Sequence, residues 1–369
     1  MAPRPRQQDL DVCPESDRAG ELSHPRDQLT LFGHHQSCEI LASAAKSGQM
    51  HHAWLFTGPK GVGKATLAWR FARALLAYSP INCPNDLSVP EDHLIARQLS
   101  ALTHPDVILL RRPWDGDKKK FKSELPIDEV RKLRGFFSRH ATFGGAHIAI
   151  VDCTDDLSLQ AQNALLKTLE EPPKNALLLL IANAPGALLP TIRSRCRTLA
   201  LRKLDSTDMQ QALSTMNAGM SQADREIAMS LANGAPGRAL SLASSGGITM
   251  YRDILDILDQ IPRLDPVMVF SFAERVAKLP HDSGVGLFCG LISQAEERLV
   301  RHAFAQDPLA AFESKVFDKL RSSIRIQSWA QHWEEMRGQF RRADELNLDK
   351  KQLILNTFFS IESLVERTS

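Results

Sequence analysis

The sequence predicts an α/β domain with a mostly parallel sheet, followed by a small helical lid and an all-helical C-terminal domain. Up to residue 203, short apolar runs typical of buried strands alternate with helical patterns, an order that builds parallel sheets. Beyond Leu201 the strand signals fade. Apolar residues then recur at helical spacing, for example Trp329, Trp333, Met336 and Phe340. A chain of 369 residues is long enough for two or three domains with cores of their own.

The N-terminal residues 1–28 differ in composition from the rest of the chain. They are rich in Pro, Arg, Asp and Ser and contain few apolar residues, so we expect a mobile leader. From Leu29 the pattern becomes orderly, and Ile40, Leu41 and Ala44 lie on one helical face. The α/β domain is therefore expected over 29–203.

A phosphate loop is the clearest chemical motif. The stretch Gly58–Ala65, GPKGVGKA, follows an apolar run and precedes a helical pattern, which is the context that this motif requires. Its glycines let successive N–H groups face phosphate oxygens, the helix N-terminus adds its dipole, and Lys64 reaches the β and γ oxygens. The residues predicted to contact nucleotide here are Gly58, Gly61, Val62, Gly63, Lys64 and Thr66.

The least regular part of the chain lies between Cys83 and Phe143. Val107–Leu110 predicts a strand, and the loop after it carries Lys118, Lys119, Lys120 and Lys122. A charge run of this kind is more often a solvated loop than a nucleic acid contact. A helix is then marked by Ile127, Val130, Leu133 and Phe137.

The best-defined stretch runs from His147 to Cys196. His147–Val151 is short, apolar and rich in β-branched residues, and it predicts a buried strand that ends at the carboxylate of Asp152. Ser158 is a good N-cap for a helix that runs to Glu171, where two prolines forbid continuation. Leu177–Ile181 predicts a second buried strand. Two guanidiniums, Arg193 and Arg195, come after a turn that ends this strand, and such groups suit bidentate phosphate recognition.

These motifs resemble a known family. The run NALLKTLEEPP from Asn163 to Pro173, with Ser194-Arg195-Cys196, is similar to bacterial clamp loader subunits of the AAA+ superfamily. The run His51-His52-Ala53-Trp54 and the run Gly63-Lys64-Ala65-Thr66 resemble the delta-prime family of DNA polymerase III subunits. The likeness extends from Leu31 to the end of the chain, strongly to Arg238 and by pattern beyond.

The resemblance implies a place in the DNA polymerase III holoenzyme, a DNA-directed DNA polymerase. The protein would help to load the sliding clamp onto primed DNA. Its expected partners are gamma/tau-like and delta-like clamp loader subunits, and through the assembly the sliding clamp and primed DNA. The lid is expected over 204–246, and a helical collar for oligomerisation over 247–369.

Two positions depart from the pattern of an active ATPase. Position 65 is Ala where the motif has Ser or Thr to hold magnesium, and Thr66 points about 100° away, although it can reach the α-phosphate. Relatives carry Asp-Glu at the strand end, whereas this chain has Asp152-Cys153. The nearby Asp155 and Asp156 are more readily helix caps than replacements for the glutamate. We therefore expect at most weak binding of ATP or ADP, weakened magnesium binding, and no appreciable turnover by the isolated chain.

The family also implies roles for residues outside the loop. Gly33 and His34 lie where relatives hold the adenine, and a plain helix cap is the alternative. Asn183 matches a sensor of the γ-phosphate, with an ordinary turn as the alternative, and Arg238 matches the arginine of the lid. No zinc is expected, because Cys83 stands without a second cysteine until Cys153.

Arg195 carries the main functional prediction. The family motif implies that its guanidinium acts in trans, as an arginine finger on ATP held by a neighbouring subunit; the alternative is a salt bridge within its own domain. Arg193 is more readily a surface or structural ion pair. The competing functions are a self-sufficient AAA+ ATPase or other P-loop ATPase, and a DNA-binding protein that uses the lysine loop.

Composition favours the cytoplasm and gives no sign of a membrane. No apolar run approaches the roughly 20 residues that cross a bilayer, and the first thirty residues lack the apolar core of a signal peptide. Six scattered cysteines fit a reducing compartment. The net charge of +2 neither demands nor excludes nucleic acid.

Overall fold

The computed structural model describes residues 14–20, 22–139, 145–217, 219–280, 284–305, 310–323, 326–346 and 349–366. The chain divides into two compact units. The first consists of Met1–Ala212 with Gly234–Arg238, and the second of Leu213–Asn233 with Ala239–Ser369.

The first unit is built on a five-stranded sheet with the strand order β2-β5-β6-β1-β7. All neighbouring strands in it are parallel. The strands are β2 (Val107–Leu110), β5 (His147–Asp152), β6 (Ala176–Ala182), β1 (Ala53–Thr57) and β7 (Arg197–Ala200). The predicted fold class, with its mostly parallel sheet, is confirmed.

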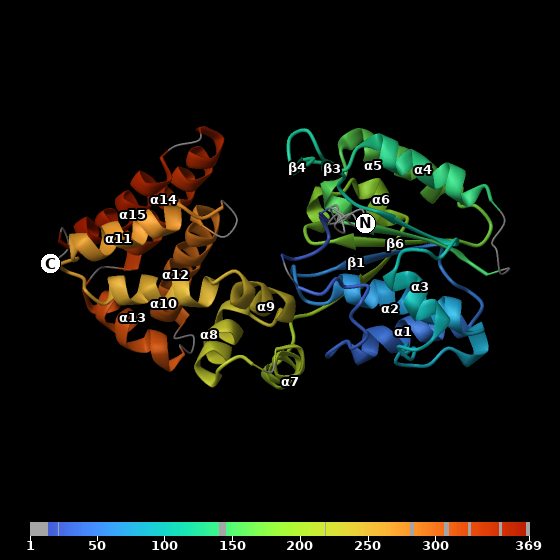
Figure 1. The fold of residues 1–369 in the computed structure, drawn as a ribbon, viewed down its shortest axis with the longest axis horizontal. Coiled ribbons are helices and arrows are strands. Elements are labelled where there is room, and N and C mark those ends of the chain that lie inside the picture. Colours follow the sequence, from blue (N-terminus) through green and yellow to red (C-terminus); the bar gives the residue numbers. More distant parts are fainter. Residues whose placement is uncertain are drawn as a thin grey trace, which may run out of the picture. The chain divides into compact units, whose positions relative to one another are not determined.

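Helices cover both faces of this sheet (Figure 1). One face carries α1 (His35–Lys46), α2 (Lys64–Ala77) and α3 (Leu94–Ser100), and the other carries α4 (Ile127–Phe137), α5 (Leu159–Glu170) and α6 (Pro190–Ser194). Side chains alternate between the two cores, because successive residues of a strand point to opposite faces. In β1, Trp54 and Phe56 enter the first core and Leu55 enters the second.

The caps that position these elements follow from local chemistry. Ser158 accepts a hydrogen bond from the N–H of Ala161 at 3.2 Å, which confirms it as the N-cap of α5. Helix α4 begins at Ile127 and carries two acidic residues in its first turn, where the helix dipole favours them. The shorter 3₁₀ segments of this unit are η1 (Pro80–Asn82), η2 (Thr154–Asp156) and η3 (Pro185–Ala187).

The lysine loop forms a small hairpin rather than an irregular loop. Its strands β3 (Trp114–Asp115) and β4 (Lys120–Phe121) pair antiparallel. The rings of Trp114 and Phe121 meet edge to face with centroids 5.0 Å apart. The lysines therefore stand on an ordered turn, and their side chains are exposed.

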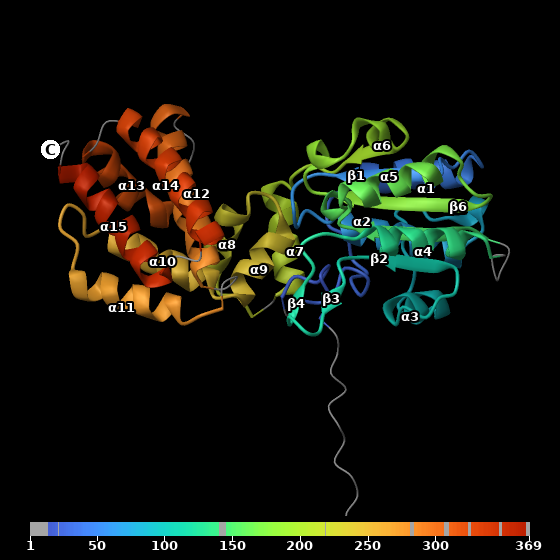
Figure 2. The same ribbon diagram turned by 90° about the horizontal axis from the view of Figure 1, so that it is seen from above.

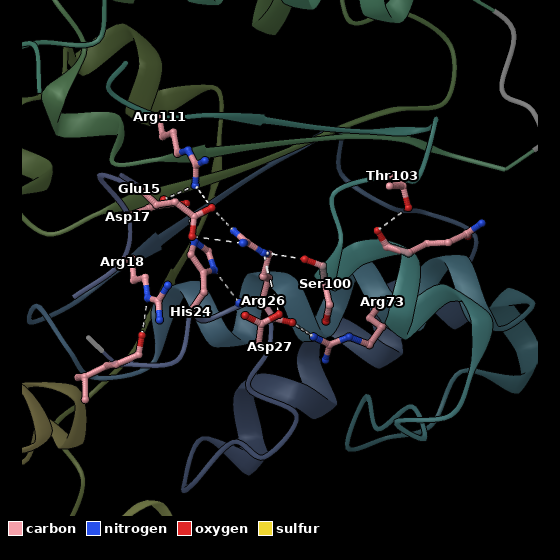
Figure 3. A network of polar contacts seen from close by, with 12 residues as sticks. Glu15, Asp17, Arg18, His24, Arg26, Asp27, Arg73, Ser100, Thr103 and Arg111 are labelled. Carbon is pink, nitrogen blue, oxygen red and sulfur yellow. Dashed lines mark hydrogen bonds and ion pairs between the residues drawn. The ribbon is translucent and has the colours of Figure 1, made fainter. Parts of the chain in front are cut away.

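The prediction of a mobile leader over 1–28 is wrong for residues 14–20 and 22–28, which pack on the first unit (Figure 3). Asp17 and His24 are buried and lie 2.9 Å apart. Nη1 of Arg111 contacts Glu15 at 2.8 Å and Asp17 at 2.7 Å, and Arg26 donates to Glu15 at 2.7 Å. The prediction failed because charge pairing, not apolar burial, holds the segment. Residues 1–13 and 21 lie outside the described residues.

The second unit is helical. Its helices are α8 (Gln222–Ala232), α10 (Gly247–Leu258), α11 (Pro266–Ala277), α12 (Val285–Ala305), α13 (Ala311–Ser323), α14 (Ile326–Leu346) and α15 (Lys350–Glu366). Figure 2 shows α11, α12, α14 and α15 gathered in one bundle. Helices α7 (Ser206–Met216) and α9 (Pro236–Ser244) contain residues of both units.

The interior of the second unit contains part of the apolar stripe that recurs at helical spacing over 329–340. Trp329 and Met336 are only 2% and 1% exposed, beside a core that includes Phe288 and Phe358. These two side chains fill the unit's own core, and the helical collar for oligomerisation over 247–369 stays a prediction. Within the described parts of the chain, every helix is too short or too polar to cross a membrane.

Candidate functional site

The phosphate loop lies where the sequence places it, between β1 and α2. Gly58 and Gly61 have φ of 139° and 82°, a region that favours glycine. A Cβ on Gly58 would lie 2.4 Å from the carbonyl oxygen of Leu201, which is the residue after β7. Helix α2 begins at Lys64, so the first N–H groups of the helix face the loop without helical partners. These backbone amides have the arrangement that phosphate oxygens require.

The side chain of Lys64 is engaged by its own loop. It is 4% exposed, and its Nζ donates to the carbonyl oxygens of Gly58 and Pro59, each at 2.7 Å. Burial lowers the pKa of Lys64 to about 8, although the carboxylates of Asp152 and Asp155 favour the charged form. The loop itself thus engages two of the three N–H donors of this ammonium, which leaves one donor for a phosphate.

Two neighbouring segments cover the loop. The N–H of Gly237, at the start of α9, donates to the carbonyl oxygen of Gly61 at 2.9 Å. A Cβ on Gly61 would lie 2.7 Å from the backbone nitrogen of Arg238. On another side, Nε2 of His34 lies 2.9 Å from the carbonyl oxygen of Val62, so this ring nitrogen carries the proton and donates it. The structure thus brings His34 and the backbone of Arg238 to the loop, whereas Gly33 lies against Leu204 and Asp208; the roles of these residues toward nucleotide stay predictions.

At the end of β5, Asp152 and Cys153 stand in surroundings that do not suit water activation. Burial raises the pKa of Asp152 to about 7, the charge of Asp17 adds to this, and Lys64 opposes it. The Cys153 thiol donates to Oδ1 of Asp155 at 2.8 Å. Burial and this hydrogen bond raise the thiol pKa far above its usual range. Cys153 therefore stays protonated and is no general base.

Asn183, immediately after β6, is joined to the same cluster. Its Nδ2 donates to Sγ of Cys153 at 2.9 Å, and its backbone N–H donates to Asp155 at 3.0 Å. The structure therefore places Asn183 beside Asp152-Cys153, as the prediction of a γ-phosphate sensor requires. That role itself stays a prediction.

The prediction that Asp155 and Asp156 cap the helix after them is wrong. Asp155 accepts from the backbone N–H groups of Asn183 and Ala184, and so it ties the end of β5 to the end of β6. Asp156 pairs with Nε of Arg112 at 2.9 Å. Both residues are held by neighbouring elements, because Ser158 already caps α5.

The magnesium position lacks its usual ligand. Ala65 is partly buried and packs on the apolar core between the sheet and α2, so a methyl stands where a hydroxyl would be needed. Among the described residues, no three His, Cys, Asp or Glu side chains are grouped to hold a metal ion. His93 accepts from the N–H of Ile95 and caps α3, and Nδ1 of His104 accepts from the N–H of Asp106.

Arg195 lies away from this cluster. It follows α6 and precedes β7, so it stands at the amino edge of the sheet, while the phosphate loop follows the carboxyl end of β1. The guanidinium pairs with Glu170 through Nη2 at 2.9 Å, and Nη1 donates to the carbonyl oxygen of Thr191 at 3.2 Å. The side chain is 37% exposed. The alternative of an ion pair within the domain is thus present, whereas Arg193 is exposed on the surface.

Sequence reasoning missed several residues of these networks. The signal for Glu170 is its place at the C-terminal end of a helix, where an acidic residue opposes the helix dipole and indicates a partner elsewhere. The contact of Asp17 with Arg111 joins residues far apart in the sequence, and no local sequence pattern predicts it.

Comparison with known proteins finds relatives that match mainly the first unit. A family model described as DNA polymerase III, delta subunit, matches residues 33–205. The DNA polymerase III subunit delta' of Pseudomonas aeruginosa is 38% identical over 148 residues, 40% of this chain and 42% of that protein. The subunit delta' of Escherichia coli is 35% identical over 207 residues, 55% of this chain and 58% of that protein.

A further relative reaches more of the chain. The DNA polymerase III subunit tau of Bacillus subtilis is 26% identical over 292 residues, 78% of this chain and 48% of that protein. The chain spans about half the length of these three relatives. The matched residues 33–205 include all strands of the parallel sheet, the phosphate loop and Arg195. Over this part, the chain is similar to the DNA polymerase III delta-prime subunits.

Proposed function

We propose that the protein is a delta-prime-type subunit of the DNA polymerase III clamp loader that presents Arg195 to ATP on a neighbouring subunit. It acts as an assembly subunit and does not hydrolyse ATP by itself. Its partners are gamma/tau-type and delta-type subunits, and the assembly places the sliding clamp on primed DNA in the cytoplasm. The relatives named delta' and tau support this assignment of partners.

The position of Arg195 in the sheet carries the proposal. In a parallel sheet the amino and carboxyl ends of the strands lie at opposite edges. β1 has 5 residues, so the two edges are roughly 17 Å apart at ~3.3 Å per residue. An arginine side chain cannot bridge that distance. A phosphate that Arg195 contacts is therefore not one held by the chain's own loop, whereas a self-sufficient ATPase would need this charge at that loop.

The phosphate loop of the chain itself also supports a subunit that does not hydrolyse ATP. Lys64 is satisfied by loop carbonyls, Ala65 offers magnesium no oxygen, and Cys153 is a protonated thiol. The backbone amides of residues 61–64 and Lys64 would hold the phosphates of ATP or ADP. Residues that activate water are missing from the described part of this site. We infer weak nucleotide binding without turnover.

The experiment is ATP turnover by the reconstituted clamp loader with Arg195→Ala. In GTPases, a guanidinium supplied in trans raises the rate by about 10³ to 10⁵. The rate of ATP hydrolysis at the site that faces Arg195 should therefore fall at least about tenfold. Clamp loading onto primed DNA should slow with it. Arg193→Ala is the matched control, because that arginine is exposed two residues away in the same short segment.

Two results would contradict the proposal. Equal turnover and equal loading by the Arg195→Ala and parent assemblies would exclude the action in trans. Steady-state hydrolysis by the pure chain, abolished by Lys64→Ala, would instead favour the self-sufficient ATPase.

A further inference from the structure

The guanidinium of Arg195 is held from two sides. Glu170 accepts from Nη2 at 2.9 Å, and the carbonyl oxygen of Thr191 accepts from Nη1 at 3.2 Å. Thr191 belongs to α6 and Glu170 to the last turn of α5. A guanidinium has five N–H donors in one plane, so two anchors fix that plane and leave three donors for another ligand.

Helix stability does not explain a carboxylate at position 170. Glu170 is the final residue of α5, and Glu171 is its C-cap. The carboxyl end of a helix carries partial negative charge, so an acidic side chain there is unfavourable. The ion pair with Arg195 offsets this cost, and among the described residues no other cation pairs with the Glu170 carboxylate.

We propose that Glu170 is a positioning residue that orients Arg195 for the ATP of the neighbouring subunit. This inference rests on the proposed function. Glu170 touches the arginine and not the phosphate, so its effect must pass through the guanidinium. Glu170 fixes the plane of the guanidinium before the subunits meet. The entropy cost of ordering this long side chain is therefore not added to the transition state.

The exposure of the pair sets the size of the effect. The side chains of Arg195 and Glu170 are 37% and 49% exposed. Ion pairs of that exposure are weak because water screens them, and their loss changes an equilibrium by about two- to fivefold. Such a pair orients the guanidinium. Because the pair is weak, the guanidinium can still bind a triphosphate at the same time.

The test compares reconstituted clamp loaders that carry Glu170→Gln, Arg195→Ala or both. The measured quantity is the part of the ATP turnover that Arg195→Ala removes. The Glu170→Gln assembly should retain about a fifth to a half of this Arg195-dependent turnover. The KM for ATP should stay unchanged, because the guanidinium acts on the transition state. Glu171→Gln is the matched control: it removes one charge from the adjacent position, where the carboxylate makes no ion pair with described residues.

The double variant separates positioning from a structural role. If Glu170 acts through Arg195, Glu170→Gln should have no further effect when position 195 is Ala. Equal loss in both backgrounds, or turnover like that of the parent, would overturn the inference while leaving the action of Arg195 intact. An assembly unaffected by Arg195→Ala would overturn the proposed function and this inference with it. Subunit association and thermal unfolding of each variant should match the parent.

Discussion

Replacing Asp17 by Asn tests whether charge holds the N-terminal segment on the first unit. The carboxylate is fully buried and contacts Nη1 of Arg111 at 2.7 Å and Nε2 of His24 at 2.9 Å (Figure 3). Asn keeps the shape of the side chain and removes its charge. Arg111 then retains Glu15 as its anionic partner.

The expected loss in the free energy of unfolding is about 2 to 3 kcal/mol. A hydrogen bond to a charged group contributes about 1.5 to 3 kcal/mol, and removing one partner of a fully buried pair costs about 3 to 5 kcal/mol. The lower range applies because the Arg111 side chain is 25% exposed and keeps a second carboxylate. Each kcal/mol lowers the Tm of a unit of this size by about 2 to 4 °C, so the Tm should fall by about 4 to 12 °C.

The loss should depend on pH with a definite sign. Burial disfavours the ionised form of Asp17, but the hydrogen bond and charge of His24 and the charge of Arg111 outweigh it and lower the pKa of Asp17 below 3.8. The carboxylate therefore contributes stability above about pH 3.8, and this contribution is lost as the pH falls through the lower pKa of the folded state. The difference in the free energy of unfolding between variant and parent should be full at pH 7 and should shrink as the pH falls from about 3.8 through the pKa of the folded state.

Calorimetry of the full chain measures both effects, and Asp27→Asn is the control. Asp27 lies in the same segment, its side chain is 42% exposed, and it stands 4.0 Å from Nε of Arg26, so its loss should cost less than about 0.5 kcal/mol. Equal shifts for the two variants, or a pH-independent difference, would refute the reasoning.

Two further variants test other contacts. Gly61→Ala should lower the free energy of unfolding by about 1 to 3 kcal/mol more than Gly48→Ala, since both have positive φ but only a Cβ on Gly61 would crowd the backbone of Arg238, at 2.7 Å. Similar denaturant midpoints for these two variants would show that the loop tolerates the extra atom. Tyr251→Phe should cost about 1 to 2 kcal/mol, because it removes the 2.6 Å hydrogen bond to the fully buried Glu313. A urea midpoint like that of the parent would count against that estimate.

The elements that the sequence predicted are those whose signals are local. The apolar run at His147–Val151, the cap at Ser158 and the glycines of the phosphate loop each need only a few neighbouring residues to be recognised. The parallel order of the strands follows from their alternation with helices. Lys64 and Asp152 interact electrostatically, since the loop after β1 and the end of β5 lie at the same edge of the parallel sheet.

The parts that the sequence did not predict depend on partners far apart in the chain. Low apolar content indicated a mobile leader, but composition does not reveal that Asp17 meets Arg111, 94 residues away. Likewise, the stripe at Trp329 and Met336 has the same spacing whether it faces a core or a subunit, and only the packed bundle shows that it is buried. The pairing of Arg195 with Glu170 belongs to the same class.

Because hydrogen bonds within the chain cover the phosphate loop, the affinity for nucleotide depends on the fraction of molecules in which these bonds are open. Lys64 donates to two carbonyl oxygens of its own loop, so a nucleotide that needs more than the third N–H of this ammonium binds only the molecules in which those bonds are open. The apparent Kd is then the intrinsic Kd divided by the open fraction. A loop that is open in about one molecule in a hundred would bind about a hundredfold more weakly than its amides alone would allow. Variants that weaken the cover should therefore tighten binding without a new contact to the ligand.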